Sequence, residues 1–249
     1  MTYSCYDPAM PSHFAETARR LGVELDDEAL RRFRLYRDRI VRSAAEFSLT
    51  TVRDPDGIEI RHFLEAIAFG VLLGQRGLLS NGARVLDIGS GAGLPGLPLK
   101  IAWPHLNVTL LEATGKKCRF LEQVVLELGL GEVEVVEARI EDAGRDAARR
   151  SSYDLVVARA VAPLPVLLEY ALPLLKVGGR LAVNKGSAAE REIDESDRAL
   201  HELGGVIEEA LPFYPPEVMG QTLIVVRKVA ETPERYPRRA GIPSKRPLA

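Results

Sequence analysis

The sequence contains little cysteine and little histidine. Its only two cysteines among 249 residues, Cys5 and Cys118, lie far apart and match no zinc, redox or disulfide spacing. The four histidines stand at positions 13, 62, 105 and 201 and form no ligand cluster. We therefore expect no bound metal and a reducing, cytoplasmic environment.

Long hydrophobic runs and an excess of either charge are also missing. The longest apolar stretches, such as residues 66–74, are too short to span a bilayer. Residues 1–10 lack the charged start and apolar run of a signal peptide. The formal net charge is −2, so any role in nucleic-acid binding has to come from a local basic patch. These absences predict a protein that is neither inserted in a membrane nor secreted.

The first third of the chain has a helical periodicity. Asp26 or Asp27 can cap a long amphipathic helix, and a second helix is expected from about residue 58 to 74. The first helix carries many arginines opposite its apolar face, which we interpret as a solvated surface, with an RNA-facing stripe as the alternative. These arginines are Arg31, Arg32, Arg34, Arg37, Arg39 and Arg42.

From residue 83 onwards, short apolar runs alternate with helical segments. Strands are expected at 84–88, 108–112, 133–136, 154–158, 180–184 and 222–227, and helices at 95–103, 115–129, 163–175 and 188–203. This alternation predicts an α/β fold with a doubly wound, mostly parallel sheet, whose last strand runs antiparallel. We expect a helical segment over 1–80, a core over 81–229 and a basic tail over 230–249.

A glycine-rich segment follows the first predicted strand. Glycines stand at 89, 91, 93 and 96, and Pro95 suits the first turn of the next helix. Glycine lets the main chain turn tightly and lie close to a ligand. The order Asp-x-Gly-x-Gly-x-Gly, which begins at Asp87, differs from the dinucleotide fingerprint Gly-x-Gly-x-x-Gly. The segment predicts a nucleotide site at the carboxyl end of the strand.

An acidic residue ends the second predicted strand. Glu112 stands nineteen residues after Gly93, and a carboxylate at that place can accept hydrogen bonds from both hydroxyls of a ribose. Together with Asp87 and the glycines, it resembles the pattern of class I methyltransferases that use S-adenosylmethionine. The resemblance implies S-adenosylmethionine as the cofactor and a Rossmann-like core.

The C-terminal tail combines basic side chains, prolines and one aromatic ring. Residues 231–249 contain five basic residues, two acids and four prolines. We expect this tail to be extended and to bury little of its surface. Its cations and Tyr236 suit single-stranded RNA, whereas a tail that serves only solubility is the alternative.

Several separated segments share the pattern of a single family. They are Leu49-Thr50-x-x-Arg53-Asp54-Pro55, Arg61-His62-Phe63-Leu64, Asp87-x-Gly-x-Gly-x-Gly-Leu-Pro-Gly, Lys116-Lys117-x-Arg119-Phe120-Leu121, Ala158-Arg159-Ala160, Lys185-Gly186 and Tyr236-Pro237-Arg238-Arg239-x-Gly241-Ile242-Pro243. From about Arg39 to the C-terminus, the chain resembles the bacterial 16S ribosomal RNA guanine-N7 methyltransferases known as RsmG or glucose-inhibited division protein B. It departs from the usual residues of that family at Ser48, Glu65-Ala66 and Ala158, where Asn, Asp-Ser and Ser are common.

The resemblance implies contacts between particular residues and the cofactor. These residues are Asp87, Gly89, Gly91, Leu94, Glu112, Ala113, Thr114, Ile140, Glu141 and Arg159. Gly89 and Leu94 would line the methionine part through their backbones, and Glu112 would hold the ribose. Each polar contact has a structural alternative: Asp87 can satisfy loop amides, Glu141 can cap a helix and Arg159 can pair with a carboxylate. Candidates for RNA contact are Arg61, His62, Lys185, Arg235, Arg238 and Arg239.

The implied reaction is methyl transfer to N7 of a guanosine in a conserved loop of 16S ribosomal RNA near the decoding centre. Because N7 carries a lone pair and no proton, the reaction needs no general base. Arg159 and Lys185 are therefore candidates for positioning the substrate, with a phosphate clamp or a structural ion pair as alternatives. The expected partner is 16S ribosomal RNA or the small subunit, and the expected state is a monomer.

Three other functions compete with this interpretation. A methyltransferase for small molecules would share every cofactor residue. An NAD-linked oxidoreductase would share the fold, although the glycine spacing argues against it. A non-catalytic ribosome-assembly factor would retain only a relic of the cofactor site.

Overall fold

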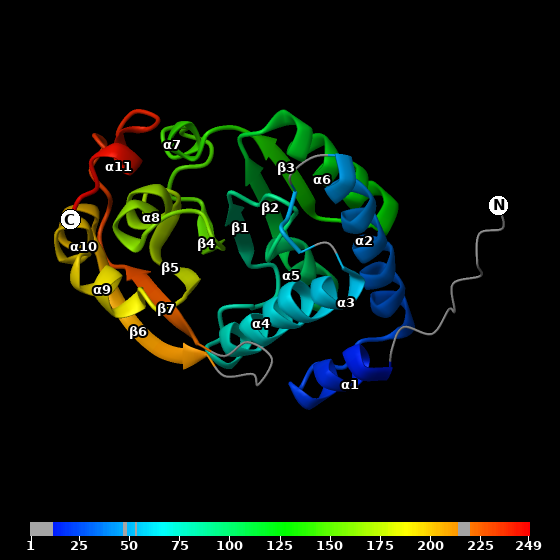
Figure 1. The fold of residues 1–249 in the computed structure, drawn as a ribbon. Coiled ribbons are helices and arrows are strands. Elements are labelled where there is room, and N and C mark those ends of the chain that lie inside the picture. Colours follow the sequence, from blue (N-terminus) through cyan, green and yellow to red (C-terminus); the bar gives the residue numbers. More distant parts are fainter. Residues whose placement is uncertain (1–11, 47–48, 53, 214–219) are drawn as a thin grey trace.

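The computed structural model describes residues 12–46, 49–52, 54–213 and 220–249. Within these ranges, seven strands form one sheet in the order β3-β2-β1-β4-β5-β7-β6 (Figure 1). The strands are β1 (Arg84–Ile88), β2 (Asn107–Glu112), β3 (Val133–Glu137), β4 (Tyr153–Ala158), β5 (Leu175–Lys185), β6 (Gly205–Phe213) and β7 (Gln221–Lys228). Strands β1 to β5 pair in parallel, and β7 runs antiparallel between β5 and β6. The predicted doubly wound, mostly parallel sheet is confirmed.

Helices cover both faces of this sheet (Figure 1). They are α1 (Ser12–Arg20), α2 (Asp27–Glu46), α3 (Pro55–Ile58), α4 (Glu65–Gln75), α5 (Gly96–Ala102), α6 (Gly115–Leu128), α7 (Ile140–Ala143), α8 (Leu164–Ala171), α9 (Ala189–Asp194), α10 (Asp197–Leu203) and α11 (Ile242–Lys245), and a π-helical segment, Glu59–Leu64, joins α3 to α4. None of the helices in the described ranges is both long and apolar enough to cross a bilayer.

The central strands are buried on both faces because helices cover each face. Val85 and Leu155 point into one apolar core, and their neighbours Leu86 and Val156 point into a second core on the other face. Such strands are expected to be continuous apolar runs. This explains why the sequence predicted β1 at its observed boundaries and placed β2 within one residue of them.

The N-terminal helices share the first of these cores with the sheet. Asp26 accepts a hydrogen bond from the backbone N–H of Ala29 at 2.7 Å and so caps α2, as expected. On the apolar face of α2, Phe33 packs against Phe63 with ring centroids 5.1 Å apart. The arginine face is not wholly solvated, however, because Arg37 is buried and its guanidinium pairs with Glu59 at 2.5 Å.

Three sequence-based expectations for the elements were wrong. Strand β6 was not predicted; it lies at the sheet edge, where Pro212 is tolerated and its glutamates can face solvent. The single helix expected over 188–203 is two helices, α9 and α10. The helix expected over 58–74 begins three residues earlier, at Pro55, and contains the π-helical segment.

The expectation of an extended tail that buries little was also wrong. Tyr236 and Leu248 are 5% and 4% exposed and belong to the second core. The Arg238 guanidinium pairs at 2.6 Å with Glu169 of α8, a carboxylate that is completely buried. The tail therefore packs as part of the fold.

Strand order reverses at the centre of the sheet. From β1 the chain proceeds outward through β2 and β3, and it then returns to β4 on the other side of β1. In sheets of this kind, ligands bind in the crevice at the carboxyl ends of the strands beside the reversal. The loops that follow β1, β2 and β4 therefore define the place to look for a site.

Candidate active site at the carboxyl ends of the parallel strands

The loop after β1 has a backbone that favours glycine. Gly89, Gly91 and Gly93 have φ angles of +67°, +58° and +91°, a region that other residues enter only with strain. A Cβ atom at Gly93 would lie 2.5 Å from a carbon of Leu97, whereas one at Gly91 would meet nothing closer than 3.8 Å. The main chain at Gly91 is therefore open on its side-chain face, where a ligand can approach it.

Glu112 ties this loop to the end of β2. Its two carboxylate oxygens accept hydrogen bonds from the backbone N–H groups of Gly91, at 3.0 Å, and Thr114, at 2.9 Å. Each oxygen of a carboxylate can accept a second hydrogen bond. Glu112 can therefore hold the glycine loop and still accept bonds from two neighbouring hydroxyls. Ala113 and Thr114 lie exposed beside it.

Asp87 stabilises the loop that follows β1. Its Oδ2 atom accepts a hydrogen bond from the Gly96 backbone at 2.9 Å, and its Oδ1 atom has no hydrogen-bond partner among the described residues. Complete burial raises the pKa of Asp87 to about 7, although the Gly96 N–H and the charge of Arg159 act in the opposite direction. Tyr36 adds a second support, since its hydroxyl donates to the Ala92 carbonyl.

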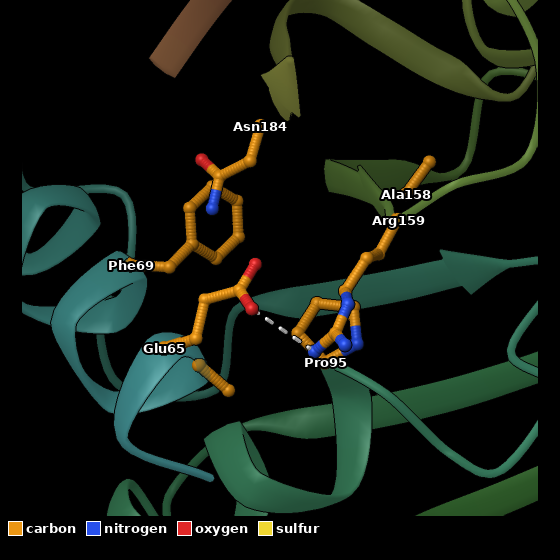
Figure 2. A pocket seen from close by; sticks show the side chains of 7 residues that line it. Glu65, Phe69, Pro95, Ala158, Arg159 and Asn184 are labelled. Atoms are coloured by element: carbon orange, nitrogen blue, oxygen red, sulfur yellow. Dashed lines mark ion pairs between the residues drawn. The ribbon is translucent and has the colours of Figure 1, made fainter. Parts of the chain in front are cut away.

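Arg159, at the end of β4, connects the sheet to the N-terminal helices. Its Nη2 atom lies 2.5 Å from Nδ1 of His62. Its Nη1 atom lies 3.6 Å from a carboxylate oxygen of Glu65 (Figure 2). A guanidinium can only donate, so Nδ1 of His62 accepts, although the Arg61 carbonyl lies 3.0 Å from the same nitrogen. The Nε2–H group of His62 then donates to the Thr50 hydroxyl at 2.8 Å.

The protonation state of His62 follows from this arrangement. Burial, together with the neighbouring positive charge of Arg159, lowers the pKa of His62 to about 4. The imidazole is therefore neutral at physiological pH and serves as a fixed acceptor for Arg159. With only 5% of its surface exposed, His62 is poorly placed for the RNA contact that the sequence analysis suggested.

A small pocket lies beside the glycine loop. Glu65, Ala66, Phe69, Pro95, Ala158, Arg159 and Asn184 line it (Figure 2). The sequence analysis singled out only Arg159 among these as a site residue. Asn184 ends the strand predicted over 180–184, and a polar residue at the end of an apolar strand was the signal that could have identified it. For Phe69, which follows the helical apolar pattern, the sequence offered no signal.

The structure separates the predicted site residues into two groups. Asp87, Gly89, Gly91, Glu112 and Arg159 meet where β1, β2 and β4 end. Leu94 is also in this loop, with its side chain in the core.

The second group is engaged in structural contacts. Lys185 donates to the Ala162 carbonyl at 2.5 Å and pairs with Glu192 at 2.9 Å. Glu141, next to Ile140 at the start of α7, is buried and accepts the Gly241 N–H at 2.8 Å. For Lys185 and Glu141 the contacts therefore favour structural roles over contacts to substrate or adenine.

The comparison with known proteins gives the family. Residues 29–214 match the family described as rRNA small subunit methyltransferase G. A protein of that name from Chloroflexus aggregans is 45% identical over 94% of this chain and 96% of the relative. Another, from Desulfitobacterium hafniense, is 43% identical over 93% of this chain and 95% of the relative. The chain belongs to this family.

These two relatives match this chain over almost their whole length. Among solved structures, a protein described as a sarcosine dimethylglycine methyltransferase from Galdieria sulphuraria is similar, with a TM-score of 0.52 and 14% identity over 72% of this chain and 89% of that one. The cyclase SpnF has a TM-score of 0.53 and 16% identity over 68% and 83%. These likenesses show the class I methyltransferase fold, and the chemistry has to be argued from the site.

Proposed function

We propose that this protein transfers a methyl group from S-adenosylmethionine to N7 of a guanosine in 16S ribosomal RNA, the guanosine at position 527 in the loop near the decoding centre. The family supports an rRNA of the small subunit as the substrate. The observation that carries the proposal is the arrangement of Glu112 and Gly91: a buried carboxylate, bonded to an open glycine backbone, with acceptor capacity left for a ribose.

The residues at this edge fit the proposed cofactor. Glu112 would hold the two ribose hydroxyls, and the open face of Gly91 would lie against the amino-acid part. Asp87 keeps the loop in shape through Gly96. When bound, S-adenosylmethionine supplies an electrophilic methyl group on a sulfonium sulfur.

The contribution of the protein to the reaction is orientation. N7 of guanine carries a free lone pair, so no side chain has to remove a proton from it. In agreement with this, His62 is held as a neutral acceptor, and burial raises the pKa of the Cys118 thiol, which makes Cys118 unsuited as a nucleophile. Holding two reactants in line can lower a barrier by roughly 7–11 kcal/mol at the upper end.

Exposed cations supply the proposed contact with RNA. Arg61, Arg235 and Arg239 are exposed and can reach phosphates, whereas Arg238 is committed to Glu169. Because N7 lies in the deep groove of an RNA helix, the target has to be in a loop or extruded from its stack.

The experiment that tests this function is methyl transfer followed by mapping. Small ribosomal subunits from cells that lack the modification are incubated with the protein and labelled S-adenosylmethionine, and the modified nucleoside is identified by mass spectrometry. We expect one 7-methylguanosine at position 527 of 16S rRNA. Transfer of label to another atom, or to small molecules only, would contradict the proposal.

A further inference from the structure

The pocket between α4 and the ends of β4 and β5 combines a small enclosed space with unsatisfied polar atoms. Its cavity volume is about 10 Å³, and the empty space including the open solvent at its mouth is about 240 Å³. The deepest part admits one water-sized group, and the wider mouth is open to solvent. Pro95, in the glycine loop, lines the pocket together with the apolar side chains of Ala66 and Phe69 (Figure 2). A planar base at the mouth could therefore insert only its edge.

Two hydrogen-bond acceptors face this space. Glu65 is 6% exposed, and its carboxylate is one acceptor in the lining of the pocket. Asn184 lines the same pocket, and its Oδ1 atom is buried without a hydrogen-bond partner among the described residues. A buried acceptor without a donor loses the hydrogen bonds that it makes to water in the unfolded chain, which is unfavourable. A ligand that donates here would remove that cost.

A hydrogen-bond donor lies next to these acceptors. The Nη1 atom of Arg159 is buried and has no hydrogen-bond partner within the described part of the chain. It is 3.6 Å from the nearest oxygen of Glu65, which is too far for a hydrogen bond. The other terminal nitrogen of Arg159 is occupied by His62, so Nη1 is held in place and remains available.

We propose that this pocket recognises the edge of guanine: Glu65 accepts from N1–H, Asn184 Oδ1 accepts from the 2-amino group, and Arg159 Nη1 donates to O6. The inference rests on the proposed function, and it adds the residues that select the base. N7 is adjacent to O6 on the purine and carries none of these contacts. With Pro95 of the glycine loop on the pocket wall, N7 is left free toward the proposed cofactor site.

The order of acceptors and donor on the protein excludes the other bases. Along the edge that enters the pocket, guanine presents two neighbouring donors, the 2-amino group and N1–H, and then one acceptor, O6. Adenine presents an acceptor at N1, cytosine presents two neighbouring acceptors, and uracil presents one donor between two acceptors. Each of them would leave at least one buried group of Glu65, Asn184 or Arg159 unpaired or facing a like group. Buried polar sites reject such analogues strongly for this reason.

The test compares guanosine with inosine, which keeps N7, O6 and N1–H and lacks the 2-amino group. Small subunits are reconstituted with 16S rRNA that carries either nucleoside at the position methylated by the wild-type enzyme. We expect the wild type to show a kcat/KM about 10- to 100-fold higher for guanosine, the loss expected for one hydrogen bond to a buried acceptor. Asn184→Ala should lower kcat/KM for guanosine. The ratio of kcat/KM for guanosine to that for inosine should then fall to about 2 or less.

The controls separate recognition from folding. Asn107→Ala removes the same side chain at the amino end of β2, where it only donates to the Gly82 carbonyl, and should leave the ratio at the wild-type value. Asn184→Leu keeps the branching of the side chain at Cγ and removes the acceptor, and it replaces Asn184→Ala if thermal unfolding shows that variant to be unstable. Equal rates of the wild type on both nucleosides, or an unchanged ratio in the Asn184 variants, would overturn the inference. Failure of the wild type to methylate guanosine would instead overturn the proposed function.

Discussion

Among single residues, Asp87 is the one whose burial most changes its acid–base behaviour. Its pKa is raised from an ordinary value of 3.8 to about 7, mainly by burial. The folded protein therefore keeps the proton over a range of pH in which the unfolded chain has lost it. The stability that this group contributes is fully present below pH 3.8 and is lost as the pH rises to about 7.

Asp87→Asn should therefore flatten the pH dependence of stability. We expect the difference in free energy of unfolding between pH 5 and pH 8, measured with urea and without cofactor, to shrink by about 1–3 kcal/mol. Asp154→Asn is the matched control. Burial acts to raise the pKa of Asp154, but hydrogen bonds from Lys176 and the Arg84 backbone outweigh it and lower the pKa. Asp154 is thus ionised in both states throughout this range, and an equal effect of both variants would contradict the account.

Glu112 is the residue on which the cofactor proposal depends most. Glu112→Ala should raise the dissociation constant for S-adenosylmethionine through loss of hydrogen bonds to a charged group, worth about 1.5–3 kcal/mol. Glu112→Gln should be intermediate because one acceptor oxygen remains. Glu134→Ala, which removes an exposed carboxylate from the neighbouring strand β3, serves as the control in titration calorimetry. Wild-type affinity in Glu112→Ala would remove this residue from the site.

At the scale of elements, the local pattern of apolar residues predicted the strands of the sheet. The ion-pair partners that lie far apart in the sequence could not be predicted from it. Strands β1 and β2 are apolar runs bounded by glycine or acid, so their positions follow from the sequence alone. The tail looked solvated because its cations were considered without a partner. That partner, Glu169, lies on α8, 69 residues before Arg238, and nothing in a single sequence pairs them.

The same distinction holds for the candidate site. The sequence predicted Asp87, the glycines and Glu112 as site residues because they stand at or just after the ends of the first two predicted strands. The structure places them at one edge of the sheet. Glu65 and Asn184 come from α4 and β5, and their place in one pocket depends on how the N-terminal helices pack. Sequence spacing carries no information about that packing.

The tail gives a prediction at this scale. Arg238→Met leaves the buried carboxylate of Glu169 without its charged partner and should destabilise the fold by about 3–5 kcal/mol in urea unfolding. Arg239→Met, at the exposed neighbouring position, should change the stability by less than about 0.5 kcal/mol. Equal stability of the two variants would show that the Arg238–Glu169 pair does not hold the tail.

At the scale of the whole molecule, the N-terminal helices and the tail pack on opposite faces of one sheet. The helices also contribute Glu65 and His62 to the edge at which the parallel strands end. We propose that residues 81–229 are the methyltransferase core and that 1–80 and 230–249 are extensions that complete its site and its RNA-facing surface.

The central claim is that the main chain at Gly91 lies against the methyl donor. Titration calorimetry of S-adenosylmethionine into Gly91→Ala and Gly129→Ala tests it, because both glycines have φ near +60° and space for a Cβ atom, but Gly129 only ends α6, away from the site. Both variants should lose about 1 kcal/mol of stability. We predict that Gly91→Ala binds the donor at least tenfold more weakly than the wild type and that Gly129→Ala binds it equally well. Wild-type affinity in Gly91→Ala would contradict the account.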